Sequence, residues 1–387
     1  MFFICSSLMV CCVMDILRDR EPPGLIKGPS KGRGAVSNHS GRFERERSES
    51  VDDGWDLDDR DLPPLRTQVT DETPRSIIAR NTSPDIPFDR SINPYKGCEH
   101  GCVYCFARPT HAYMGLSPGL DFESRLFAKP TAPALLEREL SKPGYKPRTL
   151  HLGTNTDPYQ PIEKTRRITR GILKVLDAFN HPVSITTKSA LICRDLDILG
   201  PMAARGLFSA NVSVTTLDRR LARALEPRAP TPERRLETIR ALSNAGIPTS
   251  VMAAPMIPVL NDCELEAILE NAADAGASAA GYNLLRLPLE IKDLFTEWLD
   301  THAPDKAAHV LSQMRDARSG VLYEQDFGTR MTGSGERAKL LSKRFNLACR
   351  RLGLKPARGD GYQMDATLFR VPRRTLHPLA GDQLRLF

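Results

Sequence analysis

The fold class is decided by one strand–helix–strand stretch, HPVSITTKSALICRDLDILGPMAARGLFSANVSVTT, which occupies residues 181–216. It opens with a predicted strand over 182–189, in which apolar and polar residues alternate. A predicted helix over about 194–205 ends before Gly206, because glycine suits the left-handed residue that follows a helix. A second strand follows over 208–216. Strands separated by helices in this way form a parallel sheet with right-handed crossovers.

The same rhythm continues on both sides of this stretch. The remaining predicted strands cover about 88–97, 148–155, 247–259 and 277–288, and the remaining helices cover 163–179, Thr231 to Gly246, and about 262–275. Six strand–helix units indicate an α/β protein, and within that class a partial (β/α)6 TIM-like barrel rather than a complete eight-unit barrel. Barrels of this kind place their chemistry at the carboxyl ends of the strands.

Composition sets outer limits on function. The chain has 387 residues, of which 41% are hydrophobic and 26% are charged, as in an ordinary globular protein. No apolar run approaches 18 residues, so the sequence predicts neither a spanning helix nor a membrane partner. Nine cysteines in a chain of this length are too sparse for a secreted disulfide scaffold, and we expect a cytoplasmic protein.

Charge is distributed unevenly along the chain. Residues 330–387 carry 13 Lys/Arg and 4 Asp/Glu, a net charge of +9, so the rest of the chain sums to −2 against the total of +7. Residues 49–61 show the opposite bias, with seven acids and one arginine. We therefore expect three parts: a flexible, disordered N-terminal extension over 1–75, a core domain over 76–304, and a basic, α-rich extension over 305–387.

The cysteines fall into three sets: Cys5, Cys11 and Cys12; Cys98, Cys102 and Cys105; and Cys193, Cys263 and Cys349. The first set precedes Met14, and we expect it to lie upstream of the true translation start. The second set, Cys-x3-Cys-x2-Cys, places three thiolates on one short loop where they can face one metal centre. Either His100 or His111 completes a Cys3His zinc site, or the fourth position is left open for a small molecule, as in catalytic metal sites.

The second set also carries a family resemblance. NPYKGCEHGCVYCFAR (93–108), GTNTDPYQPIE (153–163) and EPRAP (226–230), followed by APMIPVLND (254–262), resemble the radical S-adenosylmethionine (radical SAM) superfamily in its spore photoproduct lyase-like branch, often labelled DNA repair photolyase. The resemblance implies that Cys98, Cys102 and Cys105 hold a [4Fe–4S] cluster and that S-adenosylmethionine chelates the fourth iron. It implies a radical SAM core over 76–304 and an electron donor such as flavodoxin or ferredoxin.

The resemblance also assigns a cofactor-binding role to the ends of the strands. The residues concerned are Gly153, Asn155, Asp157, Lys188, Ser213, Thr215, Arg228 and Pro255. The family's usual Gly-Gly-Glu triplet is absent, so backbone atoms with Asn155 or Asp157 would meet the amino group of the cofactor. Lys188, or alternatively Arg228, would meet its carboxylate. Ser213 and Thr215 would meet the ribose, and the backbone at Pro255 the adenine.

The implied reaction is reductive cleavage of S-adenosylmethionine to a 5′-deoxyadenosyl radical, which abstracts hydrogen from an unknown substrate. No catalytic residue is assigned. Spore photoproduct lyase returns a hydrogen atom from a cysteine near its second strand, whereas HLGTNTDPYQP (151–161) contains none, and Cys193 is the substitute to examine. A nucleic-acid lesion repair lyase is the first alternative, and a zinc-stabilised nucleic-acid-binding protein is the second. We expect a monomer.

The C-terminal region adds a further pattern. In GSGERAKLLSKRFNLACRRLGL (333–354) an apolar stripe predicts a packed helix, and Arg337, Arg344 and Arg351 recur every seven residues on one face. That face is either solvated or in contact with the phosphates of a nucleic acid.

Overall fold

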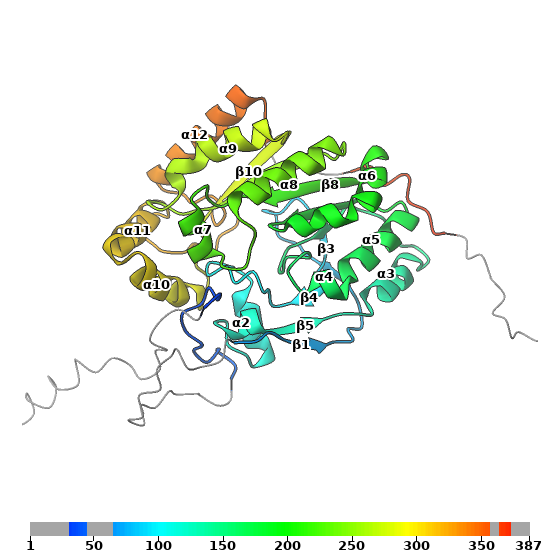
Figure 1. Ribbon diagram of the computed structural model, residues 1–387, viewed down its shortest axis with the longest axis horizontal. Coiled ribbons are helices and arrows are strands. Elements are labelled where there is room, and N and C mark those ends of the chain that lie inside the picture. Colours follow the sequence, from blue (N-terminus) through cyan, green and yellow to red (C-terminus); the bar gives the residue numbers. More distant parts are fainter. Residues whose placement is uncertain (1–30, 45–64, 357–363, 373–387) are drawn as a thin grey trace, which may run out of the picture.

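The computed structural model describes residues 31–44, 65–356 and 364–372 (Figure 1). Its main sheet has eight strands in the order β11-β10-β9-β8-β7-β6-β3-β2. These strands are β2 (Ile78–Arg80), β3 (Arg90–Ile92), β6 (Leu150–Leu152), β7 (Val183–Thr187), β8 (Phe208–Ser213), β9 (Thr249–Met256), β10 (Ala279–Leu284) and β11 (Lys355–Pro356). The six strands from β3 to β10 run parallel, whereas β2 is antiparallel to β3.

The predicted fold class is confirmed. Each of the six strands from β3 to β10 lies within one of the six predicted stretches, whereas β11, which pairs parallel with β10, was not predicted. The two edge strands, β2 and β11, do not pair with each other in the described part of the chain. The sheet is therefore open, as in an incomplete barrel.

Helices connect the parallel strands. They are α4 (Glu163–Arg166), α5 (Ile168–Ala178), η3 (Ala190–Asp195), α6 (Leu196–Ala204), α7 (Arg219–Leu225), α8 (Pro232–Asn244), η4 (Asp262–Glu264) and α9 (Leu265–Asp274). Figure 1 shows α5, α6 and α8 in succession along one face of the sheet. The predicted helix-ending glycines, Gly206, Gly246 and Gly276, have φ angles of 72°, 72° and 97°.

Other elements surround this framework. They are β1 (Gln68–Asp71), β4 (Tyr95–Lys96), η2 (Arg108–Met114), α2 (Asp121–Ser124), β5 (Arg125–Ala128), α3 (Ala132–Leu140), α10 (Ile291–His302), α11 (Pro304–Asp316) and α12 (Glu336–Leu352). Strands β1, β5 and β4 form a second, three-stranded sheet. No helix in the described ranges combines the length and apolar character needed to cross a membrane.

The N-terminal part differs from the expectation of a flexible extension over 1–75. Ala35, Val36 and Ser37 are buried, and the buried Glu123 carboxylate accepts hydrogen bonds from the amides of Gly34 (2.9 Å) and Ala35 (2.8 Å). These residues are docked and not disordered, because a carboxylate on α2 binds their backbone. Residues 68–71 of the same predicted extension form β1, which pairs with β5. Residues 1–30, with the first cysteine set, and 45–64, with the acidic run, lie outside the described residues.

The arginines on α12 form ion pairs with acidic residues of the η4–α9 segment. Arg337 lies 2.7 Å from Asp262 and Arg344 lies 2.6 Å from Glu266, while Arg351 pairs with Glu270. The packed helix is confirmed, since its apolar stripe is buried against the core. Each guanidinium of the arginine row has a carboxylate partner, and Arg351 is in addition 60% exposed, as on a solvated face. Phosphate contact by this row stays a prediction.

Candidate active site at the cysteine loop

The candidate site is built on the cysteine loop, residues 97–105, which follows β4. Cys98 and Cys102 are buried and Cys105 is partly exposed, and all three are free thiols. The loop turns at Gly97 and Gly101, whose φ angles are 75° and 68°. A Cβ atom on Gly101 would lie 2.7 Å from a carboxylate oxygen of Glu123, so this position has no room for a side chain.

The fully buried Arg108 holds the loop from behind. Its guanidinium donates to the carbonyls of Cys102 (2.8 Å) and Gly101 (3.2 Å), and to those of Pro118 (3.0 Å) and Gly119 (2.9 Å). The same guanidinium forms an ion pair with Glu123, which is also fully buried. All five N–H donors of this guanidinium make hydrogen bonds, and a buried charge is tolerated only under this condition.

Gln160 fixes the other end of the loop. Its side chain accepts from the amide of Glu99 at 2.9 Å and donates to the carbonyl of Gly97 at 3.1 Å. The loop is therefore clamped by hydrogen bonds on both sides of Cys98.

A buried charge cluster lies beside the loop, centred on Glu226 after α7. The Glu226 carboxylate accepts from Thr215 Oγ1 (2.6 Å), from Tyr104 Oη and from Arg235, and it lies 3.9 Å from Lys188 Nζ. Burial alone would raise the pKa of Glu226, but the Arg235 and Lys188 cations hold it at about 2. Glu226 is therefore ionised, and Arg235 supplies its nearest countercharge.

Lys188 follows β7 and is oriented toward the loop. Its Nζ lies 5.8 Å from the centre of the Tyr104 ring, and its side chain is 18% exposed. Burial acts to lower the pKa of Lys188, but Cys102, once its thiol is ionised, and the Glu226 carboxylate raise it above the ordinary value. A protonated amine thus lies near one of the three thiols.

Asp157 links the end of β6 to the same place. Its carboxylate accepts from Thr187 Oγ1 (2.6 Å) and from the amide of Lys188 (2.8 Å), and it lies 3.4 Å from His100 Nδ1. The expected gathering of Asp157, Lys188 and Thr215 at the cysteine loop is therefore observed in the geometry.

Three further expected residues lie at the margin of this group. Ser213 and Thr215 both donate to the carbonyl of Ala254, at 3.2 and 3.1 Å. The carbonyl of Pro255 accepts from Asn261 Nδ2 at 3.0 Å, and the same amide donates to the carbonyl of Thr215 at 2.7 Å. Arg228 lies 3.2 Å from Glu99 on the loop.

Gly153 and Asn155 have other contacts. A Cβ atom on Gly153 would lie 2.0 Å from the carbonyl oxygen of Thr186, so glycine at this position allows β6 and β7 to approach each other. The amide of Asn155 donates to Asn93 Oδ1 at 3.1 Å. Neither residue shares a hydrogen bond with the cysteine loop in the described part of the chain, and their assignment to the cofactor remains a prediction.

A cavity of about 340 Å³ opens beside the loop. It is lined by His100, Tyr159, Pro161, Lys164, Ser189, Leu191, Arg228, Ala229 and Pro230. Its size is in the range that small-molecule ligands occupy. A cavity large enough for a small molecule therefore contacts the cysteine loop at His100.

The described residues do not form the Cys3His zinc site that was one alternative for the cysteine loop. Among the described residues, no three His, Cys, Asp or Glu side chains converge on one ion position, as ligands at about 2.3 Å from zinc must. His111 Nε2 instead lies 3.0 Å from the carbonyl of Arg125, and His100 faces Asp157, so the expected Cys3His set is not formed. A cluster binds its three thiolates through three different irons, and the sulfur atoms then stand further apart.

Cys193 lies elsewhere in the fold. It is partly buried on η3 and packs against the main hydrophobic core, whereas the loop cysteines belong to two separate apolar clusters. This is the position of a structural thiol, and burial raises its pKa.

Sequence reasoning missed Arg108, Glu123, Glu226 and Arg235. Glu226 lies in the EPRAP segment and Arg108 ends the cysteine segment, but neither position has a sequence pattern that distinguishes it from an exposed charged residue. Arg235 lies on α8, yet it is only 2% exposed because its guanidinium reaches Glu226.

We predict that Arg108→Met lowers the free energy of unfolding by about 3–5 kcal/mol, because it leaves the buried Glu123 without its countercharge. Urea unfolding of the full chain measures this loss. Arg138→Met, an exposed change of the same type on α3, should cost no more than about 0.5 kcal/mol. Equal losses in the two variants would contradict the supporting role of Arg108.

Comparison with known proteins places this site in a family. Residues 92–272 match the sequence profile described as the Radical SAM superfamily. The chain is 39% identical over 222 residues to the uncharacterized protein Rv2578c of Mycobacterium tuberculosis, covering 57% of this chain and 65% of that protein. It is 30% identical over 173 residues to the uncharacterized protein MJ0683 of Methanocaldococcus jannaschii, covering 45% and 62%. The chain thus spans just under two thirds of the length of these relatives.

Solved structures agree at the level of the fold. Spore photoproduct lyase complexed with dinucleoside spore photoproduct superposes with a TM-score of 0.54 at 15% identity, covering 74% of this chain and 81% of the lyase. A doubly substituted form of the same lyase, with bound AdoMet and dinucleoside spore photoproduct, gives 0.53 at 14% identity over the same shares. Residues 92–272, which contain the parallel strands from β6 to β9, therefore form a radical SAM domain.

Proposed function

We propose that this chain is a radical SAM enzyme in which Cys98, Cys102 and Cys105 bind a [4Fe–4S] cluster and the neighbouring strand ends bind S-adenosylmethionine. The observation that carries the proposal is the cysteine loop itself. Three free thiols lie on one clamped loop, a protonated lysine lies beside them, and a ligand-sized cavity opens next to them.

When bound, the cluster supplies one electron to the sulfonium of S-adenosylmethionine, which is how this superfamily begins hydrogen abstraction. The chain's own part starts with the thiols. Burial raises the pKa of all three, that of Cys102 to about 12, so they are protonated until a metal replaces the proton. Arg108 and Gln160 then keep the loop from moving.

Lys188 is the best-placed group for the carboxylate of the cofactor. Its Nζ is 3.9 Å from Glu226, beyond hydrogen-bond distance, and it makes no hydrogen bond with the described side chains. Its three N–H donors therefore remain available for a charge-assisted bond to a carboxylate. Arg228 is less suited to this role because Glu99 already pairs with it.

Buried side chains close the other side of the site. Tyr104, Thr215, Glu226 and Arg235 satisfy one another, so this wall offers few groups that would hold water next to a reactive species. Asp157 fixes the backbone of Lys188 and so sets the direction of its side chain.

The partners follow from the chemistry. A one-electron donor such as flavodoxin or ferredoxin is needed, and the six described cysteines are all free, which suits a reducing compartment such as the cytoplasm. The substrate is a molecule that gives up hydrogen at this site, and its identity is open to an untargeted search for compounds that raise 5′-deoxyadenosine production.

We predict that the protein purified without oxygen is brown and holds about four irons and four sulfides. Cys102→Ala should lose the iron and the formation of 5′-deoxyadenosine with dithionite, because one of the three cluster ligands is missing. Cys263→Ala, which removes an exposed thiol, is the matched control and should retain both. A colourless protein with one zinc per chain would refute the proposal.

We predict that Lys188→Met weakens the binding of S-adenosylmethionine roughly 10- to 100-fold, the worth of one charge-assisted hydrogen bond. Isothermal titration of the reconstituted protein measures the affinity, and iron content should stay at the wild-type level. Lys174→Met, an exposed lysine change on α5, serves as the control. Unchanged affinity in Lys188→Met would remove this lysine from the cofactor site.

Repair of a nucleic-acid lesion is the second candidate function, and the fold likeness to spore photoproduct lyase favours it. The absence of cysteine from residues 151–161, and the position of Cys193 on the main core, weigh against the same hydrogen-return step. If repair is the function, ultraviolet-damaged DNA should raise 5′-deoxyadenosine formation by the reduced protein above the level with undamaged DNA. Equal levels would discard it.

A further inference from the structure

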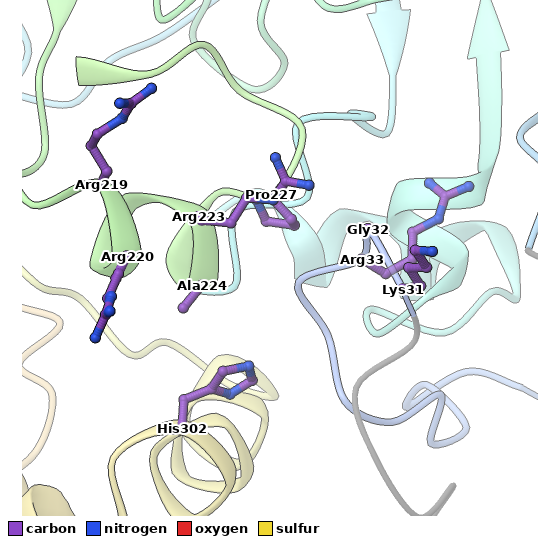
Figure 2. A pocket seen from close by; sticks show the side chains of 9 residues that line it. All are labelled: Lys31, Gly32, Arg33, Arg219, Arg220, Arg223, Ala224, Pro227 and His302. Carbon is purple, nitrogen blue, oxygen red and sulfur yellow. The ribbon is translucent and has the colours of Figure 1, made fainter. Parts of the chain in front are cut away.

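A second cavity, about 540 Å³ in volume, is lined mainly by basic residues, with Gly32, Ala224 and Pro227 between them (Figure 2). We call it the basic pocket, and its residues are Lys31, Gly32, Arg33, Arg219, Arg220, Arg223, Ala224, Pro227 and His302. Figure 2 shows the α7 arginines on one side, the segment with Lys31 and Arg33 on the other, and His302 at the end of α10 below them. No acidic residue lines it in the described part of the chain.

Most of this positive charge is not neutralised. Lys31, Arg220 and Arg223 have no ion pair with any described residue. Arg219 lies 3.6 Å from Glu233, but both side chains are mostly exposed, at 72% and 54%, so that pair is weak. Among the described residues, Lys31, Arg220 and Arg223 therefore present cations without ion-pair partners to the pocket.

Arg33 gives the pocket a fixed wall. Its guanidinium donates to the carbonyls of Glu123 (2.7 Å) and Leu65 (2.6 Å), which ties the N-terminal segment to the support of the cysteine loop. The segment that carries Lys31 is thus attached to the same buried residue, Glu123, that pairs with Arg108.

The basic pocket adjoins the candidate active site along the chain. Glu226 is the centre of the buried charge cluster, Pro227 lines the basic pocket, and Arg228 lines the smaller cavity beside His100. Consecutive Cα atoms are about 3.8 Å apart, so the Cα atoms of Glu226 and Arg228 are at most about 7.6 Å apart. The charge cluster and both cavities therefore share one short segment of chain. A molecule held in the pocket could extend to the loop without a long span.

The lining indicates the chemistry of the ligand. Guanidinium groups present a planar fork of donors that matches phosphate oxygens, and three of them lie on one short helix. The volume suits a nucleotide-sized group. A protein partner would instead need a wide surface with an apolar centre, and no large exposed apolar side chain lines this pocket.

We propose that the basic pocket binds a phosphoryl group of the substrate and thereby positions the reacting part of that substrate at the cysteine loop. The positioning role rests on the proposed radical function, whereas the binding itself does not. This assignment moves anion recognition from the arginine row of α12, where every guanidinium is paired, to α7.

The test compares two double variants of the anaerobically reconstituted protein. Arg220→Gln/Arg223→Gln removes two charges from the pocket. Lys343→Gln/Arg350→Gln removes two charges from exposed positions on α12 and is the matched control. The probes are a fluorescent single-stranded 12-nucleotide DNA, a fluorescent adenosine monophosphate and inorganic phosphate as competitor, followed by fluorescence anisotropy at several salt concentrations.

We expect the pocket variant to bind the phosphate-bearing probes at least about tenfold more weakly than wild type, and the control to stay within about twofold. For the oligonucleotide, the slope of log affinity against log salt should fall by about 1.4 in magnitude, since each lost phosphate contact contributes about 0.7. Tighter binding of the oligonucleotide than of the mononucleotide identifies a polynucleotide as the source of the phosphoryl group, and the reverse identifies a free nucleotide.

Three outcomes would overturn the proposal: no binding of any probe by wild type, equal weakening in both double variants, or a pocket variant impaired only in accepting electrons from flavodoxin. The last outcome would assign the pocket to a protein partner. Formation of 5′-deoxyadenosine by wild type with dithionite is measured separately, so failure of the radical function is distinguishable from failure of the phosphoryl site.

Discussion

The fully buried ion pair between Arg108 and Glu123 is the interaction on which the rest of the site depends. Two buried charges are tolerated only where their remaining donors and acceptors are used, and here those bonds go to backbone. The arginine binds carbonyls of the cysteine loop, and the carboxylate binds amides of the segment at Gly34 and Ala35. Three segments far apart in sequence are thereby held in one geometry, and the positions of the thiols follow from it.

A second electrostatic balance lies on the other side of the loop. Arg235 neutralises Glu226 through a direct contact, so the more distant Lys188 keeps its donors while still feeling negative charge. A buried lysine without nearby anions would lose its proton, whereas Lys188 stays protonated and can attract an anionic ligand. The Glu226–Arg235 pair thus keeps Lys188 protonated and leaves its donors available.

The sequence predicted what depends on local pattern. Hydrophobic periodicity and helix-ending glycines located all six parallel strands, and the rule that such strands end at one edge brought Asp157, Lys188 and Thr215 to the cysteine loop. It did not predict the contacts made by long side chains across the fold. Arg235 shows the reason, since its place on α8 resembles an exposed position until α7 brings Glu226 within reach. The docking of residues 34–37 was missed for the same reason.

The net charge of a chain segment does not locate the site at which an anion is expected to bind. The C-terminal segment holds the largest excess of positive charge, yet its arginine row on α12 faces acids at four-residue intervals near and on α9, and the fields cancel locally. α7 belongs to a part of the chain with little net charge, but Arg220 and Arg223 line the basic pocket together with Lys31, and no acid from the described ranges lines it. An approaching anion responds to the charges within about a Debye length, roughly 8–10 Å, and not to the sum over a segment. Recognition of a polyanion is therefore expected where like charges converge unpaired, and in this fold that place adjoins the cysteine loop.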